Sequence, residues 1–154
     1  MAASSSSTPS FGLALVRIAV GGLLLFEAQR LLRAGIGTWI VEDTAYRIAD
    51  APEWYARFGQ EVVLRFPAPI AWLVFGGTLL GGIAFFIGAL VRPAAFGVMF
   101  MMLNVFFAGP ALRREEALLV AACAFACFVS KAGRRFGLDE QLDARLPSVL
   151  TWSR

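Results

Sequence analysis

The stretch from residue 68 to residue 110 constrains this chain most, because Arg92 is its single charged side chain. A membrane-spanning helix needs about 20 mainly apolar residues to cross a hydrocarbon core about 30 Å thick. Residues 68–91 are uncharged, and they lack the polar face that a soluble helix shows every 3.6 residues. Pro93 suits the first turn of a helix and ends the helix before it. The stretch therefore predicts two spans, 68–91 and 93–110, joined by a tight turn at Arg92–Pro93.

The composition favours the same class of protein. Apolar residues make up 58% of the 154-residue chain and charged residues 16%, whereas roughly 25% of a soluble domain is charged. A globule of this size cannot bury so much apolar surface. The chain has no histidine, which excludes haem ligation by imidazole, histidine zinc sites and serine–histidine nucleophiles. No cluster of metal ligands stands out, so we expect no metal.

Two further segments complete the predicted fold. Residues 11–32 form an apolar segment whose polar residues gather near its end, and residues 115–131 form the shortest and weakest span. The sequence thus predicts an all-α integral membrane four-helix bundle. Residues 1–10 show neither a basic region nor a cleavage site, so we expect a disordered tail before an uncleaved anchor helix. Residues 132–154 form the predicted C-terminal tail.

The long connection between the first two spans predicts an amphipathic helix at the membrane interface. Asp50 suits the cap of this helix, Pro52 its first turn and Glu53 a capping box. Its apolar face would hold Trp54, Phe58 and Val62. Two interpretations remain equal. The aromatic residues Trp39, Trp54 and Tyr55 either anchor this segment among lipid head groups or pack on the mouth of the bundle or on another subunit.

Lysines and arginines divide equally between the two sides of the predicted topology, so their number does not orient the chain. A cluster of Lys131, Arg134 and Arg135 directly beyond the last span favours cytoplasmic termini in an inner membrane. Such a cluster suits anionic lipid better than nucleic acid. The charged run Arg113–Glu116 is interpreted as the loop before the last span.

Polar side chains inside the spans are the candidate ligand-binding residues, because burying them is costly without partners. Arg17 either extends its head group to the membrane surface or belongs to a site. Glu27 and Arg30 are three residues apart, so they can pair on one helix face. They form either an interfacial ion pair or part of a polar pocket in which Glu27 accepts or transfers a proton. Asn104 either hydrogen-bonds a neighbouring helix or binds a quinone carbonyl.

Small residues predict where helices pack closely. The candidates are Gly21 and Gly22 in the first span and Gly77, Gly81 and Gly88 in the second. The alternative is a groove for a flat apolar ligand, which we rank below packing. Cys123 and Cys127 are interpreted as small packing residues, because a disulfide across one helical turn has unfavourable geometry.

Two stretches resemble the DoxX/DoxD-like family of small four-helix membrane proteins. They are residues 17–26, with the sequence RIAVGGLLLF, and residues 132–139, with the sequence AGRRFGLD. The glycine-rich second span followed by Arg92–Pro93 is also similar. The residues that carry the C-terminal motif are Gly133, Arg134, Gly137 and Asp139.

This resemblance implies a four-helix bundle with cytoplasmic termini and an association with quinone-linked oxidoreductases. It also implies a polar residue near the end of the first span, where this chain has Glu27. The leading hypothesis is a membrane subunit of such a complex that binds a quinone near Arg17, Glu27, Arg30 and Asn104. The alternative is a non-catalytic accessory subunit that packs on a larger respiratory or photosynthetic complex, and a transporter ranks last. The sequence assigns no catalytic residue, and membrane lipids and other membrane or redox subunits are the expected partners.

Overall fold

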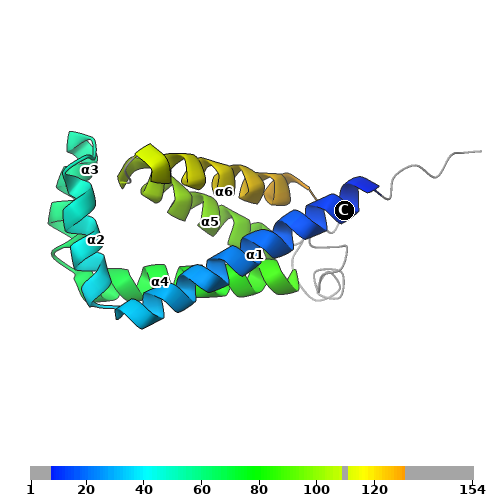
Figure 1. Cartoon of the computed structure of the whole chain (residues 1–154), viewed down its shortest axis with the longest axis horizontal. Helices are drawn as coiled ribbons and strands as arrows, with labels where there is room; N and C mark the ends of the chain where they lie inside the picture. The colour runs from blue at the N-terminus through cyan, green and yellow to red at the C-terminus, as the bar shows by residue number, and fades with distance from the viewer. Residues whose placement is uncertain (1–7, 109–110, 131–154) are drawn as a thin grey trace, which may run out of the picture.

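The computed structural model describes residues 8–108 and 111–130, and this part of the chain is helical and contains no strand. Four long helices lie alongside one another: α1 (Thr8–Ala34), α4 (Pro67–Ile87), α5 (Val91–Ala108) and α6 (Ala111–Val129). Three short elements lie across one end of them, namely α2 (Thr38–Ile48), α3 (Glu53–Phe58) and the π-helical turn η1 (Gly59–Val63). We call these three elements the cap (Figure 1).

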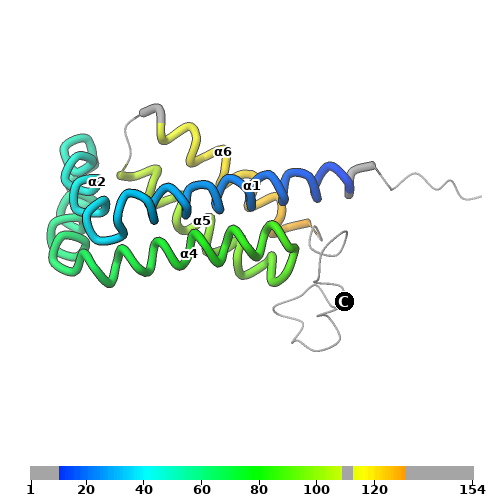
Figure 2. The backbone as a smooth tube through the Cα atoms, turned by 60° about the horizontal axis from the view of Figure 1, so that its bottom comes forward, coloured from blue at the N-terminus to red at the C-terminus, as the bar shows by residue number. Residues whose placement is uncertain are grey.

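The long helices pack as two close pairs, α1 with α4 and α5 with α6. The α4–α5 hairpin joins the two pairs, and α1 also contacts α6. The beginning of α1, the α4–α5 turn and the end of α6 lie at the end of the bundle opposite the cap (Figures 1 and 2). The end of α5 and the beginning of α6 lie at the capped end (Figure 1).

The core lies where α1, α4, α5 and α6 meet. Its buried residues are Val20, Leu24, Phe85, Val91, Ala95, Val98, Ala124 and Cys127. Many of these side chains are small, so the helices approach one another closely. At the α1–α4 crossing, a Cβ atom added to Gly21 would lie 2.6 Å from the backbone nitrogen of Phe86. Contact between the backbones therefore fixes this crossing.

The turn between α4 and α5 differs from the sequence prediction. α4 ends at Ile87, and Gly88 follows it with a left-handed backbone (φ 76°) whose N–H donates to the Ala84 carbonyl over 2.9 Å. Arg92 and Pro93 lie inside the first turn of α5. The predicted turn at Arg92–Pro93 is therefore wrong. A proline in a first turn loses no hydrogen bond, and the left-handed glycine is what ends the preceding helix.

The cap also differs from the sequence prediction. Sequence reasoning missed α2, which begins after a bend where Gly35 has a φ of 87°. α3 begins at Glu53 behind Pro52 and shows no side-chain capping hydrogen bond, so the predicted capping box is wrong. Glu53 instead pairs with Arg57 over 2.7 Å. Gly59 is buried because the side chain of Ile48 on α2 lies directly against it.

α6 begins earlier than the sequence predicts. The run Arg113–Glu116 forms the first turns of this helix, so its interpretation as a loop is wrong. Charge alone does not mark a loop, because arginine and glutamate have high helix propensity. Arg114 also donates to the backbone carbonyl of Asp50 over 3.3 Å. The beginning of α6 is therefore attached to the cap.

Three of the long helices are long and apolar enough to cross a membrane, namely Phe11–Ala34, Pro67–Ile87 and Val91–Ala108. Their outward surfaces are apolar. Leu80 on α4 and Phe96 on α5 expose more than 60% of their surface. α6 presents an outward face of the same kind, formed by Leu118, Leu119, Phe125 and Val129. A bundle with such an exterior suits a lipid environment better than water.

Candidate functional site

A polar contact links the cap to the bundle. The Tyr55 hydroxyl on α3 donates to Oδ1 of Asn104 on α5 over 3.3 Å. The Nδ2 atom of Asn104 donates to the Phe100 carbonyl one turn earlier over 2.8 Å. A primary amide has two N–H groups, so the second one stays available to a ligand. The long Tyr55 bond leaves the hydroxyl able to turn toward another acceptor.

Aromatic rings surround this contact. Phe107 lies at the end of α5, with its ring centroid 5.0 Å from that of Trp54 and 6.4 Å from that of Tyr55. The Phe58 and Phe106 rings lie at 5.7 Å from Tyr55 and 5.3 Å from Phe107, respectively. We call these five aromatic residues and Asn104 the cap site. Hydrogen-bond donors beside aromatic rings suit a flat ligand that carries carbonyl oxygens.

Burial raises the pKa of the Tyr55 phenol above its usual value, while the positive charge of Arg47 acts in the opposite direction. The phenol therefore keeps its proton throughout the physiological range. Tyr55 can act as a hydrogen-bond donor to a carbonyl oxygen under these conditions.

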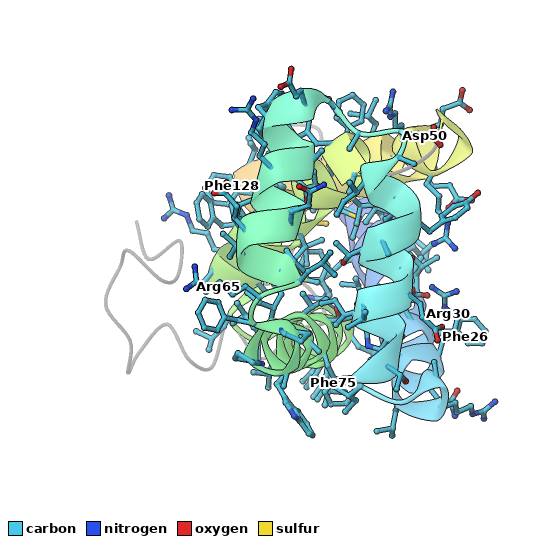
Figure 3. All side chains as sticks on the ribbon, turned by 90° about the vertical axis from the view of Figure 1, so that its left-hand side faces the viewer. Phe26, Arg30, Asp50, Arg65, Phe75 and Phe128 are labelled. Carbon is cyan, nitrogen blue, oxygen red and sulfur yellow. The ribbon has the colours of Figure 1, made fainter. Side chains whose placement is uncertain are left out.

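The Glu27–Arg30 pair lies apart from the cap site. Arg30 Nε donates to Glu27 Oε2 over 3.0 Å, and its Nη2 atom contacts the other carboxylate oxygen. Both side chains are at least one third exposed near the capped end of α1. Arg30 and Phe26 lie on the same flank of the molecule as α2 (Figure 3). This arrangement holds Arg30 beside the bend that leads into α2.

Arg17 lies inside the bundle with none of its surface exposed. Glu27 lies ten positions further along α1. At a rise of 1.5 Å per residue, the two residues are about 15 Å apart along the helix axis. Arg17 neighbours Cys127, a buried free thiol on α6. The structure therefore does not join Arg17, the Glu27–Arg30 pair and Asn104 in one site.

The predicted packing glycines have different surroundings. Gly21 meets Gly82 and Phe86 of α4. Gly77 faces Met101 of α5, and Gly81 faces Val98 of α5. Gly22 has open space where a side chain would begin, and Gly88 ends α4. The C-terminal motif residues Gly133, Arg134, Gly137 and Asp139 lie outside the described residues.

Sequence reasoning named Tyr55 as an interfacial aromatic residue, but it missed the hydrogen bond of Tyr55 with Asn104. The sequence shows a tyrosine in the connection and an asparagine inside a predicted span. It does not show that they meet, because the two residues lie 49 positions apart in the chain. Among the described residues no group of three or more potential metal-ligating residues occurs. Comparison of the chain with protein-family models, with curated proteins and with solved structures found no match.

Proposed function

We propose that the chain is an integral membrane four-helix protein in which α1, α4, α5 and α6 cross the bilayer. The apolar outward face of α6 supports its inclusion, because the charged residues of this helix fall within its first turns. The cap lies across the ends of the helices (Figure 3). In this proposal the cap therefore lies at head-group depth, with its exposed Trp54 ring at the interface. We propose cytoplasmic termini, as the resemblance to DoxX-like proteins implies.

We further propose that the cap site binds the head group of a quinone and that the protein is a membrane subunit of a quinone-linked oxidoreductase. The Tyr55–Asn104 contact carries this proposal, because it places two hydrogen-bond donors among aromatic rings at the end of an apolar bundle. The phenol and the amide would donate to a quinone carbonyl. The isoprenoid tail would lie along the apolar exterior.

A photoreactive benzoquinone analogue tests the quinone proposal with the full chain in lipid nanodiscs. We expect labelled peptides from α3 and the second half of α5. Asn104→Leu should weaken binding about two- to tenfold, the range of one neutral hydrogen bond. Thr78→Val is the matched control. It also removes a polar group inside the bundle, where Thr78 donates to the Val74 carbonyl. Labelling confined to other helices, or equal binding by both variants, would contradict the proposal.

The second candidate is a non-catalytic accessory subunit. The exposed aromatic and aliphatic side chains of α4 and α5 favour it, since they suit contact with another membrane protein as well as with lipid. Purification in mild detergent separates the candidates. Stable partner chains without extractable quinone indicate the accessory role, and quinone bound to the isolated protein indicates the first candidate.

A further inference from the structure

A pocket lies at the bend between α1 and α2, and the proposed quinone site does not use it. It has a volume of about 290 Å³. The lining residues that carry the argument are Arg30 and Ala34 of α1 and Trp39, Glu42, Asp43 and Tyr46 of α2. We call it the elbow pocket. The four α2 residues recur at i, i+3, i+4 and i+7, so one face of this helix lines the pocket.

The bend itself fixes the pocket at the end of α1. Gly35 takes a left-handed backbone that ends this helix. The Thr38 hydroxyl then donates to the Ala34 and Gly35 carbonyls over 3.2 Å each. The candidate span of α1 also ends at Ala34. In the proposed membrane placement, the elbow pocket therefore lies at the depth of lipid head groups.

The ion pairs around the elbow pocket do not include all of its carboxylates. Arg30 pairs with Glu27, and Arg47 pairs with Asp43 over 2.6 Å. Glu42 has no ion-pair partner among the described residues. The C-terminus of α1 adds partial negative charge from its last carbonyls. Trp39 and Tyr46 also line the pocket, and the face of an aromatic ring attracts a cation. This side of the pocket therefore suits an ammonium group.

The same pocket also offers hydrogen-bond donors. Arg30 directs two of its five N–H groups to Glu27, and the other three form no hydrogen bond with the described residues. A phosphate oxygen is a strong acceptor for these N–H groups.

From these two sets of groups we infer that the elbow pocket binds a phosphoethanolamine head group of a membrane lipid. The ammonium contacts Glu42 and Asp43 on the Trp39 and Tyr46 side, and the phosphate accepts from Arg30. A primary ammonium fits better than choline, because it donates hydrogen bonds to the carboxylates. This inference rests on the membrane placement proposed above, but not on the quinone site.

Native mass spectrometry of the full chain in detergent tests the inference by titration with lipids. We expect phosphatidylethanolamine to bind about tenfold or more tightly than phosphatidylglycerol, which lacks the ammonium. Glu42→Gln should lower the affinity for phosphatidylethanolamine about tenfold, the scale of one charge-assisted hydrogen bond. The matched control is Glu61→Gln, which removes an exposed carboxylate of the cap outside the pocket and should leave the affinity unchanged.

Equal affinities for the two lipids, or equal effects of Glu42→Gln and Glu61→Gln, would overturn the inference. Choline lipid that binds as tightly as ethanolamine lipid would overturn the choice of a primary ammonium. Soluble phosphoethanolamine that binds as tightly as the lipid would overturn the lipid source. Asn104→Leu should leave lipid binding unchanged, so failure at the cap site and failure at the elbow pocket are distinguishable.

Discussion

At the scale of single residues, the polar side chains inside the apolar helices lie in separate surroundings. Arg17 is enclosed among the bundle helices, Arg30 lies beside the elbow pocket and Asn104 joins the cap to α5. All three residues stand out in the sequence, because each is polar inside an apolar segment. Their separation was not predictable, since hydropathy gives depth along a helix but not the partner that a side chain meets. The contact of Tyr55 with Asn104 was missed for the same reason.

The burial of Tyr55 makes stability depend on pH. Burial raises the folded-state pKa of this phenol above its ordinary value of 10.0, so the folded state holds the proton more tightly than the unfolded state. The stabilising contribution is present below pH 10 and is lost as the pH rises through the folded-state pKa. Thermal unfolding in detergent at rising alkaline pH should show this loss in the native chain. Tyr55→Phe should remove that part of the pH dependence, and an unchanged profile would contradict the assignment.

Gly21 should tolerate no side chain. An added Cβ would lie 2.6 Å from the Phe86 nitrogen, and a backbone atom cannot move aside alone. Gly21→Ala should therefore lower the free energy of unfolding by about 1–3 kcal/mol, as overpacking does. Gly22→Ala is the matched control, because nothing lies within 4 Å of its added Cβ. Denaturant unfolding in micelles measures both variants, and equal stabilities would refute the close α1–α4 crossing.

At the scale of elements, the three most apolar helices were predictable from the sequence, because an uninterrupted apolar segment of this length has the dimensions of a membrane span. Their ends were less predictable. The sequence prediction placed the turn at Arg92–Pro93, whereas Gly88 ends α4 in the structure. α2 was missed because it is short and carries charges among its apolar residues. The charged residues at the start of α6 were likewise interpreted as a loop, although they form its first turns.

The α4–α5 turn depends on the left-handed backbone of Gly88 (φ 76°). An alanine there carries a Cβ that meets the following carbonyl oxygen, so Gly88→Ala should cost roughly 1–2 kcal/mol of stability. Gly97→Ala serves as the comparison, because Gly97 lies within α5 with open space around its Cα. That variant should be neutral or slightly stabilising, since alanine has the higher helix propensity. Chemical denaturation of both variants measures this difference in the free energy of unfolding. A Gly88→Ala variant as stable as Gly97→Ala would show that the turn does not require the glycine.

At the scale of the whole molecule, a four-helix bundle carries its cap at one end and an apolar exterior around its sides (Figure 1). Two candidate sites lie at that capped end. The cap site lies between α3 and α5, and the elbow pocket lies between α1 and α2. Both would face lipid head groups if all four helices cross the bilayer. The proposed membrane placement therefore depends most on α6, which is not among the three candidate spans.

Cysteine accessibility in sealed proteoliposomes tests this central claim directly. Cys123 and Cys127 are first replaced with alanine, and single cysteines are then introduced at Glu116, near the start of α6, and at Val129, its last residue. Glu61→Cys reports the side of the cap. We predict that a membrane-impermeant maleimide labels positions 61 and 116 from one side and position 129 from the other. Labelling of positions 116 and 129 from the same side would show that α6 does not cross the membrane, and would contradict the four-span arrangement.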